Sequence, residues 1–207
     1  MNNQSPKIKK GRKFDQVVAG ARDVFMREGY TGASVDSIAK AAGVSKATLY
    51  SYFPDKKLLF LEVAKTECLR QSETAMVQAH SGASTEETLT DIARRMTGFV
   101  LSEFGQQVFR ICVAESERFP ELGRTFYRSG PELARARVVE FLNCATERGD
   151  LAIEDVELAA DQFAELCKAD LFQRVVFNMP GKVTQPDLDR VIKGAVQMFM
   201  ARYGTSR

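Results

Sequence analysis

Apolar side chains recur at helical spacing through most of the chain. The first run, which ends at Gly29, comprises Phe14, Val17, Val18, Ala21, Val24 and Phe25. A second stripe at positions 35, 38, 39 and 42 follows Ser34, and serine is a favoured residue for capping a helix N-terminus. The strict alternation of apolar and polar residues that marks a half-buried strand does not stand out. The pattern therefore predicts an all-α protein.

Glycine, proline and capping residues divide this pattern into separate helices. Three short helices are predicted at 13–28, 35–42 and 46–52. A long helix then begins after its cap, Asp55, and runs to about His80. Further helices are predicted near 85–103, 105–118, 120–129, 132–148, 155–178 and 187–203.

The second and third short helices predict a helix-turn-helix arrangement. They are separated by Gly43-Val44-Ser45, and two helices that meet through a short glycine-containing turn are typical of this DNA-binding motif. Leu49 and Phe53 lie four residues apart on one side of the third helix. We expect these two side chains to pack against the first two helices, which leaves the other side of the third helix exposed.

The exposed side of the third helix carries residue types that suit a DNA groove. Lys46 donates hydrogen bonds of the kind that guanine accepts, and the small Ala47 permits close approach to a thymine methyl group. Hydroxyl groups on the helix and at the helix caps suit phosphate oxygens, as does a lysine at the start of the long helix. The predicted DNA-binding residues are Ser34, Ser45, Lys46, Ala47, Thr48, Tyr50, Tyr52 and Lys56. A solvated surface connector with two capped helices would show the same residues, and the residues alone leave both interpretations open.

Charge is distributed unevenly along the chain, although the net charge is only +2. Residues 1–60 hold eleven basic and five acidic side chains, whereas the other 147 residues hold 18 basic and 22 acidic ones. A basic segment on an acidic body is consistent with a polyanionic partner that meets only the N-terminal part. Residues 1–11 form a predicted disordered basic arm, for which minor-groove contact and full solvation are equally open.

Other functional classes find little support in the sequence. No apolar run approaches the length of a membrane helix and the N-terminus lacks a signal core, so we expect a cytoplasmic protein without membrane contact. The single histidine, His80, and the cysteines Cys68, Cys112, Cys144 and Cys167 show no metal-ligand or catalytic spacing. We expect the cysteines to be reduced packing residues. The sequence therefore predicts no enzyme activity, no metal and no cofactor.

The N-terminal part resembles a known family. The run ARDVF at Ala21–Phe25 and the stretch GYTGASVDSIAKAAGVSKATLYSYFPDKKLL at Gly29–Leu59 are similar to the DNA-binding domain of TetR-family transcriptional regulators. Ala47 stands where members of that family often have glycine. The resemblance implies base or groove contact by Lys46, Ala47 and Tyr50, and phosphate contact by Ser34, Ser45, Thr48, Tyr52 and Lys56. A second stretch, residues 108–132, resembles the C-terminal region of the AefR/AcrR-like branch.

The larger C-terminal part carries many apolar and aromatic side chains between residues 85 and 148. These either fill an ordinary core or line a space for a small apolar or amphiphilic ligand. The candidate ligand-binding residues are Met96, Phe99, Phe109, Cys112 and Phe141. The family resemblance implies an inducer site in this region and a ligand-driven movement of the long helix that begins near Asp55.

The two last helices, 155–178 and 187–203, carry more apolar surface than one protomer covers, which predicts a homodimer with a four-helix interface. The predicted organisation is a helix-turn-helix domain at 12–54 and a ligand-binding and dimerisation domain at 55–207. The predicted function is a transcriptional repressor that a small ligand releases from double-stranded operator DNA. The alternative is a DNA-binding regulator that needs no ligand or that responds to cysteine oxidation.

Overall fold

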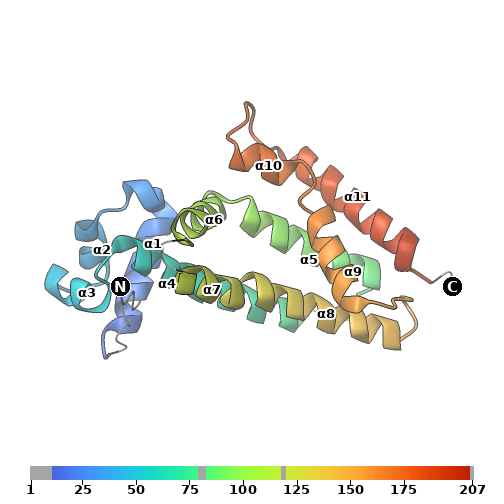
Figure 1. The fold of residues 1–207 in the computed structure, drawn as a ribbon, viewed down its shortest axis with the longest axis horizontal. Coiled ribbons are helices and arrows are strands. Elements are labelled where there is room, and N and C mark those ends of the chain that lie inside the picture. The colour runs from blue at the N-terminus through green and yellow to red at the C-terminus, as the bar shows by residue number, and fades with distance from the viewer. Residues whose placement is uncertain (1–10, 79–82, 118–119, 206–207) are drawn as a thin grey trace. The chain divides into compact units, whose positions relative to one another are not determined.

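The computed structural model describes residues 11–78, 83–117 and 120–205, and within these ranges it is helical apart from an isolated β-bridge between Leu151 and Gly204. The predicted all-α architecture is therefore confirmed for the described residues (Figure 1). In chain order the helices are α1 (Phe14–Gly32), α2 (Val35–Ala41), α3 (Lys46–Tyr52), α4 (Lys56–Gln78), α5 (Thr85–Val100), α6 (Glu103–Glu115), α7 (Pro120–Ser129), α8 (Pro131–Glu147), α9 (Val156–Leu166), α10 (Leu171–Val176) and α11 (Gln185–Tyr203). None of the helices in these ranges combines the length and the apolar character that a membrane crossing requires.

Most helices begin and end within a few residues of the predicted positions, with two exceptions. α1 continues to Gly32, because Gly29, with φ 68° and ψ 175°, kinks the helix without ending it. The single helix predicted at 155–178 is wrong, because α9 ends at Leu166 and a separate short helix, α10, follows. Asp170 lies in this break with a φ of 62°, in the left-handed region that a continuous helix excludes.

The chain divides into two compact units, which are described separately. The first unit comprises Met1–Leu69 and Glu103–Gly130, and the second comprises Arg70–Ser102 and Pro131–Arg207. The first unit therefore adds α6 and α7 to the three N-terminal helices and the first part of α4. The predicted boundary after residue 54 separates a DNA-binding from a ligand-binding domain. It concerns function, whereas the two units are defined by packing, so the boundary stays a prediction.

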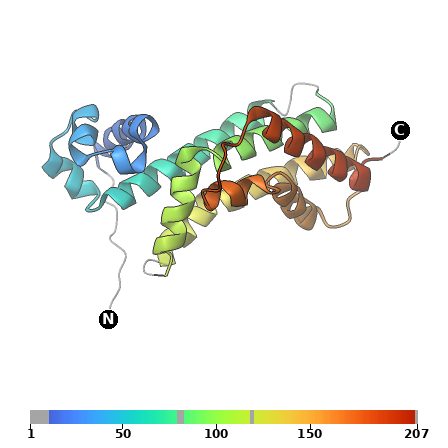
Figure 2. The ribbon, with the colours of Figure 1, turned by 90° about the horizontal axis from the view of Figure 1, so that it is seen from above.

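The three N-terminal helices pack together through small and aromatic side chains. α2 lies against α1, and α3 lies against α2 (Figure 1 and Figure 2). Gly20 permits the contact between α1 and α2, because a Cβ atom there would lie 2.5 Å from the backbone nitrogen of Ala42. Leu49 and Phe53 are 1% and 0% exposed, which confirms the predicted packing side of α3. The other buried apolar residues of these helices include Phe14, Val17, Ala21, Phe25, Ile38 and Ala39.

Aromatic and charged contacts fix the first half of α4 within the first unit. Phe60 of α4 contacts Phe25 of α1 and Phe104 of α6, with ring centroids 4.9 and 5.1 Å apart. Nε of Arg22 on α1 donates a hydrogen bond of 2.8 Å to the carboxylate of Glu67 on α4, a side chain that is only 2% exposed. A buried carboxylate of this kind needs its cationic partner, since burial without one is costly.

The second unit is a bundle in which α5, α8, α9 and α11 share one apolar core. Its buried residues are Leu89, Ala93, Val138, Leu142, Ala145, Leu151, Ile153, Ala159, Ala160, Phe163, Cys167, Ile192, Ala195, Val196 and Phe199. The rings of Phe163 and Phe199 meet edge to face, 5.1 Å apart. The end of α11 is held by a backbone hydrogen bond of 2.7 Å from the nitrogen of Ala152 to the oxygen of Tyr203. The core therefore joins helices that are far apart in the sequence.

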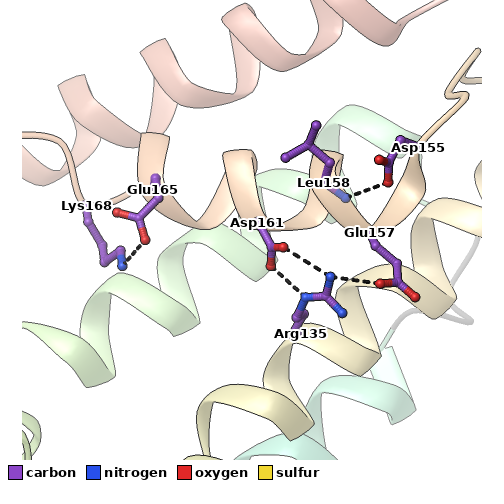
Figure 3. A network of polar contacts seen from close by, with 7 residues as sticks. All are labelled: Arg135, Asp155, Glu157, Leu158, Asp161, Glu165 and Lys168. Carbon is purple, nitrogen blue, oxygen red and sulfur yellow. Dashed lines mark hydrogen bonds and ion pairs between the residues drawn. The ribbon is translucent and has the colours of Figure 1, made fainter.

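A charged network ties α8 to α9 at the surface of the second unit (Figure 3). Nε of Arg135 donates to Asp161 at 2.6 Å, and its Nη2 donates to Glu157 at 3.1 Å. These hydrogen bonds, the one to Asp161 above all, raise the pKa of the Arg135 guanidinium, and they lower the pKa of the Asp161 carboxyl. Because these groups are exposed, solvent screens the ion pairs, which therefore add little to the free energy of unfolding. We infer that the pairs instead help to orient α9 on α8.

The three cysteines with described side chains differ in burial. Cys112 and Cys167 are buried, as predicted for packing residues, whereas the same prediction is wrong for Cys144, which is exposed. Burial raises the pKa of the Cys167 thiol to about 12. This thiol therefore stays protonated near neutral pH, and a protonated thiol is a poor nucleophile.

We predict that Gly20→Ala destabilises the protein by about 1–3 kcal/mol, because the new methyl group meets the backbone of Ala42 and forces α1 and α2 apart. Gly98→Ala is the matched control, since a Cβ atom there meets nothing within 4 Å and alanine is favoured over glycine inside a helix. Urea unfolding followed by circular dichroism measures both variants. An unchanged unfolding midpoint in Gly20→Ala would contradict the close contact.

Candidate nucleic-acid interface

The third helix is short because both of its ends are fixed locally. Gly43 has a φ of 61°, a left-handed conformation that glycine adopts at little cost. Ser45 then caps the helix by accepting a hydrogen bond of 3.1 Å from the backbone nitrogen of Thr48. At the other end Phe53 is extended, with φ −130° and ψ 96°, as expected for the residue before Pro54. α3 is therefore held to seven residues.

One side of α3 is exposed and the other is buried. The side chain of Lys46 is 56% exposed, Tyr50 is 49% exposed, and Ala47 and Ser51 are exposed as well. Leu49, on the opposite side, is buried. The predicted orientation of α3 is therefore confirmed, whereas contact between these residues and bases stays a prediction.

The predicted phosphate-binding hydroxyls already cap the helices. Oγ of Ser34 accepts a hydrogen bond of 2.9 Å from the nitrogen of Ser37, and Oγ of Ser37 accepts one of 3.1 Å from the nitrogen of Ser34. At α3, Oγ of Ser45 and Oγ1 of Thr48 lie 2.9 Å apart and share a hydrogen. Ser34 Oγ also donates its hydrogen to Ser37 Oγ, so a donated phosphate contact by Ser34 requires that hydrogen to turn to the DNA. In the Ser45–Thr48 pair one hydroxyl donates to the other, and the accepting hydroxyl keeps its own hydrogen for a phosphate.

Tyr52 has a packing role beside its predicted DNA contact. Its ring lies edge-on to Phe14 of α1, with centroids 6.2 Å apart, and its side chain is half-buried. A Cβ atom at Gly11 would lie 2.9 Å from its hydroxyl oxygen. The hydroxyl of Tyr52 therefore lies beside the end of the predicted basic arm, most of which falls outside the described residues.

Lys46 forms an ion pair that we did not predict from the sequence. Its Nζ lies 2.5 Å from Oδ1 of Asp36, in the first turn of α2, and both side chains are more than half exposed. An exposed pair of this kind contributes little to stability, because water screens it. It does place a carboxylate beside the lysine that is predicted to meet bases, so Asp36 belongs to the candidate interface.

Lys56 is half-buried and directs its ammonium group into the protein. Nζ donates hydrogen bonds of 2.8 and 2.9 Å to the carbonyl oxygens of Tyr30 and Ala33, and it lies 4.4 Å from the centroid of the Tyr30 ring. The phosphate contact predicted for Lys56 competes with these hydrogen bonds, and it stays a prediction.

The five candidate ligand-binding residues are divided between the two units. Phe109 and Cys112 lie on α6 of the first unit, whereas Met96 and Phe99 of α5 and Phe141 of α8 lie in the second. Cys112 is buried and the other four side chains are half-buried. Their common role in ligand binding stays a prediction.

Two family models match the chain in agreement with this geometry. Residues 17–63 match the model described as bacterial regulatory proteins, tetR family. Residues 87–205 match the model described as AefR-like transcriptional repressor, C-terminal domain. The chain belongs to the TetR family. Both resemblances noted in the sequence are thereby confirmed, and the family and its fold are those of transcriptional regulators rather than of enzymes.

Individual relatives support the same assignment. A solved structure named as a TetR-family transcriptional regulator from Mesorhizobium loti is 28% identical, with a TM-score of 0.79 over 94% of this chain and 98% of that one. The flavonoid-responsive regulator FrrA is 33% identical, with a TM-score of 0.63 over 96% and 100% of the two chains. The repressor AcnR of Corynebacterium efficiens is 37% identical over 59 residues, which make up 28% of this chain and 31% of AcnR. The similarity to AcnR therefore spans about a third of that protein.

The structure adds three residues to the candidate interface of this TetR-family protein, namely Tyr30, Asp36 and Ser37. A signal for Ser37 was present, because the position three residues after an N-cap is where the partner of a capping box lies. Tyr30 accepts a hydrogen bond from Lys56, and Asp36 forms an ion pair with Lys46; both lysines lie on other helices. Contacts between helices leave no spacing pattern in the sequence, so these two could not be found there.

We predict that Tyr50→Ala weakens operator binding by about 1–3 kcal/mol, roughly five- to 150-fold. The fold should survive, because Tyr50 is 49% exposed. Tyr127→Ala is the matched control, a tyrosine that is 56% exposed on α7 of the same unit. Fluorescence anisotropy with an operator selected from random DNA measures both variants. Equal losses in the two would contradict a role for Tyr50 in the interface.

We predict that Asp36→Asn raises the affinity for DNA of any sequence severalfold, because it removes a charge that repels phosphates and frees Lys46 from its ion pair. Asp91→Asn is the control, because Asp91 forms an equally exposed pair with Arg94 on α5 of the second unit. Titration with random duplex DNA at several salt concentrations measures the effect. If Asp36→Asn binds no more tightly than Asp91→Asn, the ion pair does not restrain Lys46.

Proposed function

We propose that this TetR-family protein is a homodimeric repressor that binds a roughly palindromic operator and is released from it by a small apolar or amphiphilic ligand. The observation that carries the proposal is the exposed polar side of α3, held outward by the buried Leu49 and Phe53. A helix presented in this way fits the major groove. The basic balance of residues 1–60 supports it, since phosphate contacts dominate DNA affinity. The proposed place of action is the cytoplasm, where the DNA lies.

Exposed apolar side chains support dimerisation through the second unit. Leu158 of α9 and Met198 of α11 are 50% and 62% exposed, and Phe177 and Met179, which follow α10, are 73% and 54% exposed. Groups of exposed apolar residues mark interaction sites, and TetR regulators bind their operators as dimers. We place these residues in an interface between the C-terminal helices of two protomers. Binding of such a dimer to successive major grooves on one side of the DNA requires two copies of α3 about 34–36 Å apart.

The proposed ligand response is a population shift. A ligand that binds more tightly to a conformation with mismatched α3 spacing lowers the affinity for operator, and operator lowers the affinity for the ligand equally. The relative FrrA is named as flavonoid-responsive, which makes flavonoids one class to test. The aromatic and sulfur-containing side chains of Met96, Phe99 and Phe141 are suited to such compounds.

Cysteine oxidation has weaker support as the regulatory signal. Oxidation requires an accessible thiolate, but Cys112 is only 7% exposed and burial raises the pKa of Cys167 to about 12. Among the three cysteines with described side chains, Cys144 is the exposed one.

We predict that the double variant Leu158→Glu, Met198→Glu is a folded monomer, because a charged group costs little on an exposed site and much in an apolar interface. Val113→Glu is the control, because Val113 is 57% exposed but lies on α6 of the first unit. Sedimentation equilibrium gives the molecular mass of each. A double variant that dimerises as tightly as Val113→Glu would place the interface elsewhere.

The function as a whole is tested by selecting DNA from a random pool and then titrating ligands. We expect a selected site with two-fold symmetry, and at least one flavonoid or amphiphile that both raises the melting temperature and weakens operator binding. Operator affinity that stays constant with every ligand that raises the melting temperature would contradict ligand release. An asymmetric site would contradict binding as a two-fold dimer.

A further inference from the structure

The turn between α9 and α10 contains a strained residue, Asp170. Its torsion angles are φ 62° and ψ −47°, and the backbone nitrogen of Leu171 donates a hydrogen bond of 2.7 Å to the carbonyl oxygen of Ala169. A hydrogen bond across a single residue with a positive φ and a negative ψ defines the rare and strained form of the γ-turn. At this turn the chain leaves the direction of α9, and α10 runs another way (Figure 1).

The side chain of Asp170 does not account for this conformation. In the described structure its carboxylate makes no capping hydrogen bond to α10. Its Oδ2 lies 3.7 Å from Nη1 of Arg174, and this pair lies at the surface, where solvent screens it. Glycine adopts a positive φ at little cost, whereas an aspartate carries the steric strain of its Cβ atom. Other contacts therefore have to hold the turn.

The positive φ at the other end of α10 has an ordinary explanation. Asn178 has a φ of 50°, and its backbone nitrogen donates to the carbonyl oxygen of Val175 at 3.2 Å. The nitrogen of Met179 donates to the carbonyl oxygen of Arg174 at 2.9 Å. These two hydrogen bonds form the Schellman motif that ends many helices, and asparagine is one of the residues that occupy its left-handed position. Asn178 is therefore a matched reference for Asp170.

The contacts within one protomer hold α10 weakly. Leu171 is the buried residue among the six of this helix. Just beyond the helix, Phe177 and Met179 are 73% and 54% exposed. The other apolar side chains of α10, which are half-buried, are Phe172, Val175 and Val176. A strained residue persists only where its surroundings hold it, and one buried leucine is a small anchor for a helix that begins in such a turn.

A straight helix is an accessible alternative to the observed turn. Cys167 and Leu171 lie four residues apart and are both 0% exposed, so the apolar stripe of α9 continues through the turn. The nitrogen of Phe172 already donates to the carbonyl oxygen of Lys168 at 3.2 Å, which is the hydrogen bond of a continuous α-helix. A change of the backbone torsions around Asp170 would join α9 and α10 into one helix.

We propose that a second copy of this chain holds the strained turn. The dimer stabilises the bent form, in which Phe177 and Met179 meet the partner, and the separate protomer relaxes to a helix that continues from α9 through residue 170. These two side chains belong to the exposed apolar group that we place in the dimer interface, and their burial on a partner supplies free energy that the protomer lacks. The inference rests on the proposed function only in that the protein dimerises through its C-terminal helices.

Two substitutions at Asp170 test the coupling, because they should act in opposite directions. Asp170→Gly removes strain from the bent form and weakens a continuous helix, so the dissociation constant of the dimer should fall by about tenfold or more. Asp170→Ala keeps a Cβ atom and favours the continuous helix, so the same constant should rise several-fold. Sedimentation equilibrium of the full-length protein measures both. Both variants lose the contact with Arg174, so that loss cannot produce opposite shifts.

Asn178→Gly is the matched control. It also places a glycine at a positive φ next to α10, but asparagine is already suited to that position, so the dissociation constant should stay within about twofold of that of the unmodified protein.

A monomeric background provides a second readout. In the variant Leu158→Glu, Met198→Glu, the further change Asp170→Gly should lower the urea midpoint, because the glycine then lies inside a continuous helix. If that background fails to fold by circular dichroism, Phe177→Glu provides the monomer for the same comparison.

The possible outcomes are distinct. An unchanged dissociation constant in Asp170→Gly, or shifts of the same sign in both Asp170 variants, would overturn the proposal. So would a raised urea midpoint for Asp170→Gly in the monomeric background, because the strained turn would then form without a partner. An unmodified protein that stays monomeric at every concentration would overturn the proposed dimer as well, and that result is seen before any Asp170 variant is compared.

Discussion

The burial of Leu49 and Phe53 is the constraint on which the DNA-binding surface depends. α3 has only seven residues, and isolated helices shorter than about 12–15 residues are marginal in water. The two buried side chains and the cap at Ser45 supply the stability that so short a helix lacks. They also determine which side of α3 faces outward, because Lys46 and Tyr50 lie on the side of the helix opposite the buried Leu49 and Phe53. The side of α3 that we propose faces DNA is thus set by side chains that are buried on its other side.

The first unit extends this constraint from α3 to α4 and α6. The ion pair of Arg22 with Glu67 and the aromatic contacts of Phe60 fix the first half of α4 against α1. Lys56, the first residue of α4, also donates hydrogen bonds to the carbonyl oxygens of Tyr30 and Ala33, which precede α2. The start of α4 therefore cannot move without disturbing elements that carry the DNA-facing residues. Under the proposed ligand response, we infer that a ligand changes the affinity for DNA by moving the start of α4.

Sequence patterns were sufficient for features that depend on neighbours along the chain. Serine caps at positions 34 and 45, the packing side of α3 and the positions of most helices follow from spacings of three or four residues. Contacts between distant segments were not predictable, which is why the pair of Lys46 with Asp36 was missed. The break at Asp170 was missed for a related reason: Cys167 and Leu171 on either side of it are both buried, so the apolar spacing continues across it.

The central claim, that the exposed side of α3 meets operator DNA, is tested most directly by the reactivity of a thiol at position 47. Ala47 is exposed on that side, and Ala47→Cys adds one small group. The native Cys144 is exposed in the second unit and provides an internal control. With selected operator bound, alkylation by a maleimide should slow at least tenfold at position 47 and not at Cys144, because groove contact excludes the reagent. Equal alkylation of position 47 with and without operator would contradict the claim.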